Sequence, residues 1–430
     1  MHAVLVLLLA CAGKHSPGGD DTGPTTPEPP GEVVGSSAAR DTDPDVDEAT
    51  VQAHAASMRA FGLDLLRVTA GEENLFSSPY SVSIALAMTY AGANGDTERQ
   101  MADALRFDLP EDQLHAAFNA IDLTLDGRPD EVRDTGGDPG EPFRLAVVNQ
   151  LFGQVGFGFE APFLDVLAVN YDADMRLLDF SADPEGSRTA INAWVEEVTE
   201  NRIVDLLPKG SIIDLTRLVL VNAIYFKASW FLPFEESLTT DDAFTTLSGA
   251  VETVPTMHGE QETLYGRGEG YALVDLPYVG QDLVMTLIVP DAGRFTEVRD
   301  GLDPTVLDAA VEDMGTMMVT LALPRLSIRS QFVLADALKE LGMVDAFDPA
   351  LADLTGMSAD ADLYVGGVYH QAFVAVSEAG TEAAAATAVV INDESEPERV
   401  TLTVDRPFLF TIRDRPTGTV LFLGQVVDPG

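Results

Sequence analysis

A nearly unbroken apolar run in the middle of the chain limits the folds that are open to this sequence. Residues 218–226 read Leu-Val-Leu-Val-Asn-Ala-Ile-Tyr-Phe, and Asn222 is the strongly polar exception. A strand with apolar side chains on both faces has to be covered on both faces. The run therefore predicts a central strand of a large sheet that is packed on each side.

Other patterns predict the elements around this strand. Apolar residues at helical spacing indicate a first helix through residues 51–65, and Pro79 suits the first turn of a second. Thr97 and Gln100 have the spacing of a capping box for a third. Further helices are expected at residues 111–125, 160–171, 185–199 and 332–341, and strands at residues 283–289, 317–323 and 363–376. The alternating end of the chain predicts a hairpin that turns near Pro416. Helices first and strands later favour one α+β domain over residues 49–430.

The first residues predict an export signal. Residues 3–10 are apolar, are too short to span a bilayer, and end at Cys11, the single cysteine of the chain. The sequence Leu8-Leu9-Ala10-Cys11 resembles the bacterial lipobox, although no Lys or Arg precedes it. We expect residues 1–11 to be a signal peptide with a lipobox-like end, and a lipid on Cys11 to be the membrane anchor. An ordinary cleaved signal peptide is the alternative.

A segment poor in large apolar side chains follows. Residues 12–48 are rich in Gly, Pro, Thr and Asp, and such a composition predicts a disordered tether. Together with the signal, it places the protein outside the cytoplasm, either secreted and extracellular or as a lipoprotein of a bacterial cell envelope.

The net charge of the chain excludes some classes of binding partner. Asp and Glu number 70 against 25 Lys and Arg, which gives this acidic protein a formal net charge of -45. Such a chain repels nucleic acid and anionic lipid surfaces, so neither is expected as a partner. One cysteine excludes an intramolecular disulfide and a thiolate zinc cluster, and the six histidines are scattered. We expect no metal and no cofactor.

Motifs of catalysis are absent from the sequence. Neither a Gly-x-Ser-x-Gly elbow nor a His-Glu-x-x-His helix occurs. A Ser-His-acid triad that meets only in space would make the protein an envelope hydrolase, and the sequence leaves that alternative open without supporting it.

The segment that stands out is residues 378–391, Glu-Ala-Gly-Thr-Glu-Ala-Ala-Ala-Ala-Thr-Ala-Val-Val-Ile. Its alanines favour a helix, whereas the β-branched residues after them favour a strand. One interpretation is a surface helix that runs into an edge strand. The other is a segment that pivots at Gly380 and enters a sheet. Alternate side chains from Thr381 onward are small first, so one face could slip between two strands.

Several blocks of the sequence resemble the serpin family, in the family's order and over nearly the whole chain from about residue 55. The blocks are residues 74–81, 220–230, 323–328, 370–373, 406–410 and 424–429. The resemblance implies a serpin fold of three β-sheets and eight or nine helices with an exposed reactive-centre loop.

The resemblance also implies a function, that of a serine protease inhibitor that acts as a suicide substrate and not as an enzyme. A target serine endopeptidase attacks a loop bond and forms an acyl-enzyme, and the cleaved loop then inserts into the main sheet. The native state would be metastable. A non-inhibitory carrier or chaperone with the same fold, and an inhibitor of cysteine proteases, remain alternatives.

Family positions assign roles to individual residues. The hinge of the loop comprises Glu378, Gly380, Thr381, Glu382, Ala383, Ala384, Ala385, Ala386 and Thr387. A polar cluster that gates sheet opening comprises Ser78, Ser81, Asn222 and His370, and Trp230 matches the tryptophan of the breach, near the insertion point. Residues 111–125 correspond to a helix that binds sulfated polysaccharides in some members, but they contain no Lys or Arg. We therefore expect no such cofactor, and a monomer whose partner is the target protease.

In the family that the chain resembles, the cut usually falls about fourteen residues after the hinge glycine, and counting from Gly380 places the reactive bond between Glu394 and Ser395. An acidic residue before the bond predicts a protease with a basic specificity pocket, such as a glutamyl endopeptidase. The alternatives are Asp393 for an aspartate-specific protease, Val390 or Ile391 for elastase-like or subtilisin-like proteases, and Arg399 for trypsin-like proteases.

Overall fold

The computed structural model describes residues 27–134, 144–359, 363–381 and 397–430. The helices in these residues are α1 (Glu48–Thr69), α2 (Pro79–Tyr90), α3 (Gly95–Leu105), α4 (Glu111–Asp134), α5 (Ala161–Tyr171), α6 (Pro184–Val198), α7 (Phe295–Gly301), α8 (Pro304–Glu312) and α9 (Ala335–Glu340). The strands are β1 (Glu32–Val34), β2 (Leu75–Ser77), β3 (Arg144–Gln154), β4 (Met175–Leu178), β5 (Leu218–Ser229), β6 (Thr240–Thr245), β7 (Val251–Gly268), β8 (Tyr271–Pro277), β9 (Leu283–Pro290), β10 (Gly315–Pro324), β11 (Leu326–Val333), β12 (Val365–Ser377), β13 (Gly380–Thr381), β14 (Arg399–Thr403), β15 (Phe408–Asp414) and β16 (Val420–Val426).

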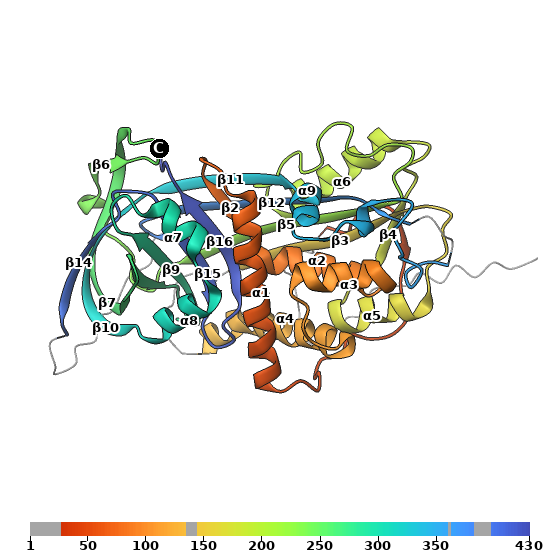
Figure 1. The fold of residues 1–430 in the computed structure, drawn as a ribbon, viewed down its shortest axis with the longest axis horizontal. Helices are drawn as coiled ribbons and strands as arrows, with labels where there is room; N and C mark the ends of the chain where they lie inside the picture. The colour runs from red at the N-terminus through yellow and green to blue at the C-terminus, as the bar shows by residue number, and fades with distance from the viewer. Residues whose placement is uncertain (1–26, 135–143, 360–362, 382–396) are drawn as a thin grey trace, which may run out of the picture.

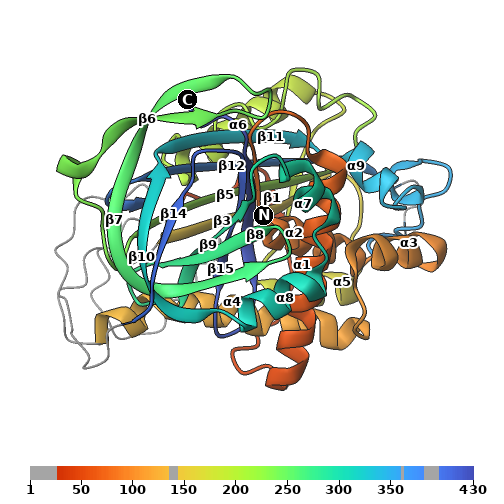
Figure 2. The same ribbon diagram turned by 60° about the vertical axis from the view of Figure 1, so that its left-hand side comes forward.

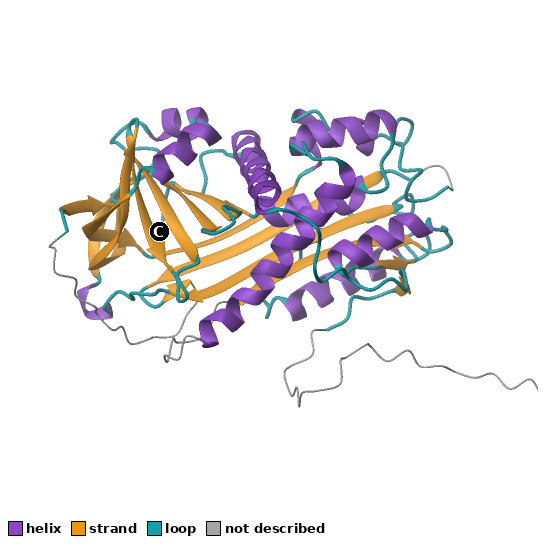
Figure 3. Ribbon diagram, turned by 90° about the horizontal axis from the view of Figure 1, so that it is seen from below, coloured by secondary structure: helices purple, strands orange, loops and turns teal. Residues whose placement is uncertain are grey.

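The main sheet has seven strands in the order β1-β4-β3-β5-β13-β12-β11 (Figure 1). β5 contains the apolar run, and both of its faces are covered. Leu220 and Ile224 pack in the same core cluster as α2, whereas Val219 and Val221 pack with α6 on the opposite face. Every residue of α2 is buried, and helices cross the long strands on the face seen from below (Figure 3). The prediction of a strand covered on both faces is confirmed.

The second sheet has the order β14-β10-β7-β8-β9-β15-β16-β2, with β6 also paired to β7. β7 is 18 residues long, pairs with β6 and β10, and then pairs with β8 through its last four residues. Through these pairings, β7 connects two of the three sheets that the family resemblance implies, so the structure has one continuous second sheet in their place. α7 and α8 lie beside this sheet (Figure 2). The predicted α+β class is confirmed, with nine α-helices in the described ranges.

Two local predictions differ from the structure. α3 begins after Asn94, so Thr97 lies inside the helix, where its hydroxyl accepts a hydrogen bond from the Asp353 amide. The expected helix at residues 332–341 is shorter at its start because residues 332 and 333 end β11, which pairs with β12. In both cases contacts between segments distant in sequence override the local pattern.

Residues 27–47 belong to the folded body and do not form a free tether. β1 pairs antiparallel with β4, where Glu32 lies opposite Leu177 and Val34 opposite Met175. Asp47 caps α1 through a hydrogen bond from Thr50. The prediction of a disordered tether over residues 12–48 is therefore wrong from residue 27 onward, and residues 12–26 lie outside the described ranges. An edge strand offers unpaired backbone groups to a neighbouring segment whatever its side chains are.

Across the described residues, no helix combines the length and the apolar composition that a membrane-spanning segment requires.

Candidate functional site: the hinge and the central seam

The insertion site that the resemblance implies lies between β5 and β12, a boundary that we call the central seam. The two strands pair in parallel there, from Val365 opposite Leu218 to Phe373 opposite Tyr225. At one end of the seam β13 lies between them and runs antiparallel to both. A strand that continued from Thr381 in the same direction would pass down the seam and separate β5 from β12.

Gly380 occupies a position that excludes a side chain. Its φ is 143°, in the region that favours glycine. A Cβ atom there would lie 2.2 Å from the Ala228 carbonyl oxygen and 2.7 Å from the Ser229 Cα. Close backbone packing, in addition to flexibility, therefore requires glycine at the residue from which the sequence predicts the pivot.

Glu378 fixes the start of the hinge to two neighbouring connections, the one between β10 and β11 and the one before β6. Its side chain is buried, and Arg325 donates from Nε to both carboxylate oxygens at 2.8 and 3.0 Å. Thr239 also donates to this carboxylate. Burial acts to raise the pKa of Glu378, but the hydrogen bonds from Arg325 and Thr239 outweigh it and lower the pKa. The carboxylate therefore stays charged and paired.

Trp230 lies where the hinge enters the sheet. Its indole stacks on Tyr278 with ring centres 4.6 Å apart, and its Nε1 donates to the Ser377 carbonyl at 2.9 Å. The Tyr278 hydroxyl lies 2.8 Å from the Thr381 hydroxyl, and burial raises the pKa of this phenol. The two aromatic residues thus hold both ends of the short connection between β12 and β13.

The four residues of the polar cluster meet beneath the seam. The Ser78 amide donates to His370 Nε2 at 3.0 Å, and the Ser78 hydroxyl donates to the Leu421 carbonyl at 2.6 Å. The Asn222 amide nitrogen donates to Ser81 Oγ at 2.6 Å. His370 Nδ1 contacts Asn222 Oδ1. All four residues are fully buried, so the cluster links α2 to both strands of the seam.

The protonation state of His370 follows from these contacts. Nε2 accepts a hydrogen bond from a backbone amide, so Nδ1 carries the proton and donates to Asn222. Burial lowers the pKa of His370 to about 3, despite a smaller opposing effect of Asn222. The imidazole is therefore neutral at ordinary pH, which a buried site without a carboxylate requires.

Asn149 is a member of the cluster that the sequence reasoning missed. It lies on β3 directly opposite Asn222 on β5, and its amide contacts Ser81 and Asn222. The signal was present in the sequence, because Asn149 follows Ala-Val-Val and precedes Gln-Leu-Phe. An amide side chain within an otherwise apolar run, as at Asn222, indicates a buried polar contact.

Several predicted residues fall outside the described ranges. They are Cys11, the hinge residues Glu382, Ala383, Ala384, Ala385, Ala386 and Thr387, and the reactive-bond candidates Val390, Ile391, Asp393, Glu394 and Ser395. Arg399 is described, and it begins β14 opposite Met318, with its guanidinium paired to Glu260. The described residues contain no group of three or more His, Cys, Asp or Glu side chains that could hold a metal ion.

Comparisons with known proteins agree with this geometry. Residues 56–429 match the family model Serpin (serine protease inhibitor). The chain is 37% identical over 366 residues to antithrombin-III of Mus musculus, which covers 83% of this chain and 77% of that protein. It is 34% identical over 383 residues to leukocyte elastase inhibitor of Equus caballus, which covers 86% and 97%.

Solved structures show the same fold. A thermophilic serpin, tengpin, in the native state superposes with a TM-score of 0.79 at 27% identity, covering 92% of this chain and 100% of that one. Uncleaved ovalbumin superposes with a TM-score of 0.76 at 25% identity, covering 87% and 99%.

Proposed function

Because the chain belongs to the serpin family, a family of protease inhibitors and not of enzymes, we propose that it is an inhibitory serpin that traps a serine endopeptidase as a covalent acyl-enzyme. The observation that supports this most directly is the arrangement at the central seam. β13 already lies between β5 and β12, and the rest of the seam is closed by parallel pairing alone.

The chemistry of trapping has two competing steps. The serine oxygen of the protease attacks the carbonyl carbon of the reactive bond, and the amine of the following residue leaves. Water would then release the enzyme, unless the freed loop first moves down the seam. Insertion exchanges one parallel pairing for two antiparallel ones, and antiparallel pairing is the more stable per residue. Insertion is therefore downhill, and trapping requires it to be faster than deacylation.

The hinge sequence favours inhibition over a carrier or chaperone role. A loop that has to enter a sheet needs small side chains on the face that passes between strands. Thr381 and the alanines that follow it satisfy this, and the close packing at Gly380 is consistent with a loop that begins as a strand.

For the target we propose a glutamyl-specific serine endopeptidase that cleaves between Glu394 and Ser395. The count from Gly380 supports this position, with Asp393 one residue earlier. The pairing of Arg399 with Glu260, and its place in β14, argue against Arg399 as the bait for a trypsin-like protease. A bait residue has to be free to enter a specificity pocket.

An elastase-like target is the second candidate, with Val390 or Ile391 before the bond. It is favoured by the 34% identity to a protein named leukocyte elastase inhibitor. Both residues have apolar side chains, which an apolar specificity pocket accepts.

The test is to incubate the full-length chain with proteases of glutamyl, elastase, subtilisin and trypsin specificity and to run denaturing gels. A complex that survives denaturation is expected with the glutamyl protease. Glu394→Ala should abolish it, and the neighbouring change Glu396→Ala should not. If every protease only cleaves the loop and no complex survives, inhibition is excluded. A complex with elastase alone would favour the second candidate.

We also propose that Cys11 carries a lipid and that the protein is held outside the cytoplasm as a monomer. Cys11→Ser should abolish lipid labelling and membrane association, and unchanged fractionation would contradict the anchor. No sulfated polysaccharide is proposed as a cofactor, because the first part of α4 lacks basic residues and Arg128, which follows, pairs with Asp414.

A further inference from the structure

Residues 27–47, which we call the N-terminal strap, touch five other elements of the fold. The Pro27 carbonyl accepts from Trp194 on α6, and β1 extends the main sheet beside β4. The Asp41 amide donates to the Val169 carbonyl on α5 at 2.9 Å. The strap then contacts α4 through Arg40 and enters α1 at the cap Asp47. It therefore joins the outer edge of the main sheet to the helices behind it.

Arg40 is the strongest attachment of the strap. Its Nε donates to Asn119 Oδ1 at 2.9 Å, its Nη2 lies 2.5 Å from Asp122 Oδ2, and Asp126 lies 4.0 Å from Nη1. Asn119 is fully buried and donates back to the Asp41 carbonyl at 2.6 Å. The side chain of Arg40 is 15% exposed. Charged hydrogen bonds at such a depth are stronger than those at the surface.

The notch that receives Arg40 is acidic and reaches the core. Asp122 also accepts a hydrogen bond from the hydroxyl of Tyr80, which is fully buried in α2. Burial and the Asp122 charge raise the pKa of Asp126, whereas Arg40 lowers it. Without Arg40, these two carboxylates would face each other without the guanidinium that now lies between the strap and α4.

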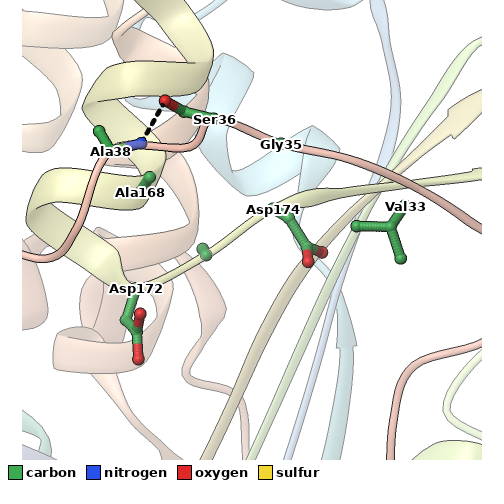
Figure 4. A pocket seen from close by; sticks show the side chains of 8 residues that line it. Val33, Gly35, Ser36, Ala38, Ala168, Asp172 and Asp174 are labelled. Atoms are coloured by element: carbon green, nitrogen blue, oxygen red, sulfur yellow. Dashed lines mark hydrogen bonds between the residues drawn. The ribbon is translucent and has the colours of Figure 1, made fainter. Parts of the chain in front are cut away.

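Between Arg40 and β1 the strap spans a hollow of about 360 Å³ (Figure 4). The hollow is lined by Val33, Gly35, Ser36 and Ala38 of the strap and by Ala168, Asp172, Ala173 and Asp174 of α5 and β4. The strap is fastened on both sides of this hollow, and at the hollow itself the Ser36 hydroxyl also donates to Asp165 on α5. The strap's own side chains are exposed or only partly buried, so its polar bonds contribute much of what keeps it attached.

We propose that the N-terminal strap is a latch that slows opening of the central seam, and that Arg40 is the residue that fastens it. Opening the seam moves β3 and β4 away from β12, together with α6, which packs on β3. Because the strap is bonded to β4 and α6, and also to α5, α4 and α1, this movement pulls on the strap's polar attachments. The inference rests on the proposed function, because a latch has a role only if the closed native state is metastable.

The experiment compares the full-length chain with its Arg40→Ala variant. Each protein is held at an elevated temperature below unfolding, and samples are assayed over time for loss of covalent complex formation and gain of heat resistance. These two changes together report spontaneous loop insertion. Loss of charged hydrogen bonds of this kind predicts about tenfold faster conversion in the variant.

Matched variants make the outcome specific. Arg99→Ala removes an exposed arginine that pairs with Asp96 and Asp103 on its own helix, and it should convert at the parent rate. Arg40→Lys keeps the charge and loses the forked geometry, so an intermediate rate is expected, and it replaces the alanine variant if that variant does not fold. Equal rates for Arg40→Ala, Arg99→Ala and the parent, in a parent that still traps protease, would overturn the latch and leave the proposed function standing. A parent that neither traps protease nor converts would overturn both.

Discussion

At the scale of single residues, the hinge depends on a position, Gly380, that has no space for a side chain. Gly380 is enclosed by the backbone of residues 228–230, and a Cβ would overlap the Ala228 carbonyl. The residues on either side are held by side chains, Glu378 by Arg325 and Thr381 by Tyr278. The start of the loop is thus seated in the sheet before any protease arrives.

We predict that Gly380→Ala converts the inhibitor largely into a substrate. The added methyl group cannot be accommodated beside Ala228, so β13 should withdraw and insertion should begin later. Strain of about 1–3 kcal/mol corresponds to roughly a fivefold to hundredfold slower insertion. The measurement is the ratio of cleaved to trapped inhibitor on denaturing gels. Gly127→Ala, whose Cβ would meet nothing within 4 Å, is the control. Equal ratios for the two variants would contradict the role of Gly380.

His370 predicts a dependence of stability on pH. Its pKa is lowered from 6.5 to about 3 in the folded protein, so below pH 6.5 the unfolded chain binds a proton that the folded chain does not. The free energy of unfolding should therefore fall on acidification, by about 1.4 kcal/mol per pH unit between roughly pH 6.5 and pH 4 for this residue. Above pH 6.5 the residue contributes no slope.

Urea unfolding of the parent and of His370→Asn, measured at several pH values, tests this. Asparagine can keep one donor and one acceptor but cannot titrate. The free energy of unfolding of this variant should therefore change less with pH than that of the parent. Parallel curves for the parent and His370→Asn would rule out this histidine as a source of acid sensitivity.

Some of these residues could be predicted from the sequence, whereas contacts between residues far apart in the chain could not. The roles of Gly380, Asn222 and His370 could be predicted from the sequence, because the segments around them resemble the serpin family. The ion pair of Arg325 with Glu378 joins residues 53 positions apart, and neither residue type indicates its partner in a chain with 70 acidic residues. Asn149 was recognisable as an amide in an apolar run, but its position opposite Asn222 depends on strand register.

At the scale of elements, the central seam is a weak boundary in a strong sheet. β5 pairs antiparallel with β3 on one side, and β12 pairs antiparallel with β11 on the other, while β5 and β12 are parallel to each other. The seam therefore has the less stable type of pairing, and it has the polar cluster beneath it.

We predict that loop cleavage protects the seam from hydrogen exchange. Amides of residues 218–225 and 365–373 should exchange more slowly after cleavage, because each strand gains an antiparallel neighbour. Amides of β15 and β16, in the second sheet, should not change and serve as an internal control. Unchanged exchange across the seam after complete cleavage would show that the loop stays outside.

Elements that the sequence did not predict share a physical reason. β7 contains Pro255 and several glycines, and its exposed residues interrupt the apolar alternation, so its pairing with β10 is visible only in three dimensions. β1 consists of three residues in a polar segment, and it exists because β4 leaves an edge free. In contrast, β5 and α2 were predictable because burial on all sides requires side chains that are mostly apolar.

At the scale of the whole molecule, the strands of the main sheet are all paired, yet the proposed mechanism adds one more strand to this sheet. In the proposed mechanism the seam between β5 and β12 opens to admit one further strand, which adds hydrogen bonds without unfolding the rest. We predict that the loop-cleaved protein melts on the order of 10 °C higher than the intact protein, from the stability that one added strand contributes in a chain of this size. Calorimetry of the two forms is the measurement. Identical melting temperatures would contradict insertion.

The path of the N-terminal strap also determines how an anchored molecule would be oriented. Across the main sheet, Val34 on β1 lies opposite Met175 on β4, which is level with Leu151 on β3 and Leu220 on β5. Thr381 lies opposite Ala228, eight residues further along β5. At about 3.3 Å per residue, this is roughly 26 Å of strand, and the chain before Val34 runs further from the hinge. A lipid at Cys11 would therefore attach the body by the end remote from its bait. The hinge at Thr381 would then lie on the side of the body away from the membrane, toward proteases that arrive from the surrounding medium.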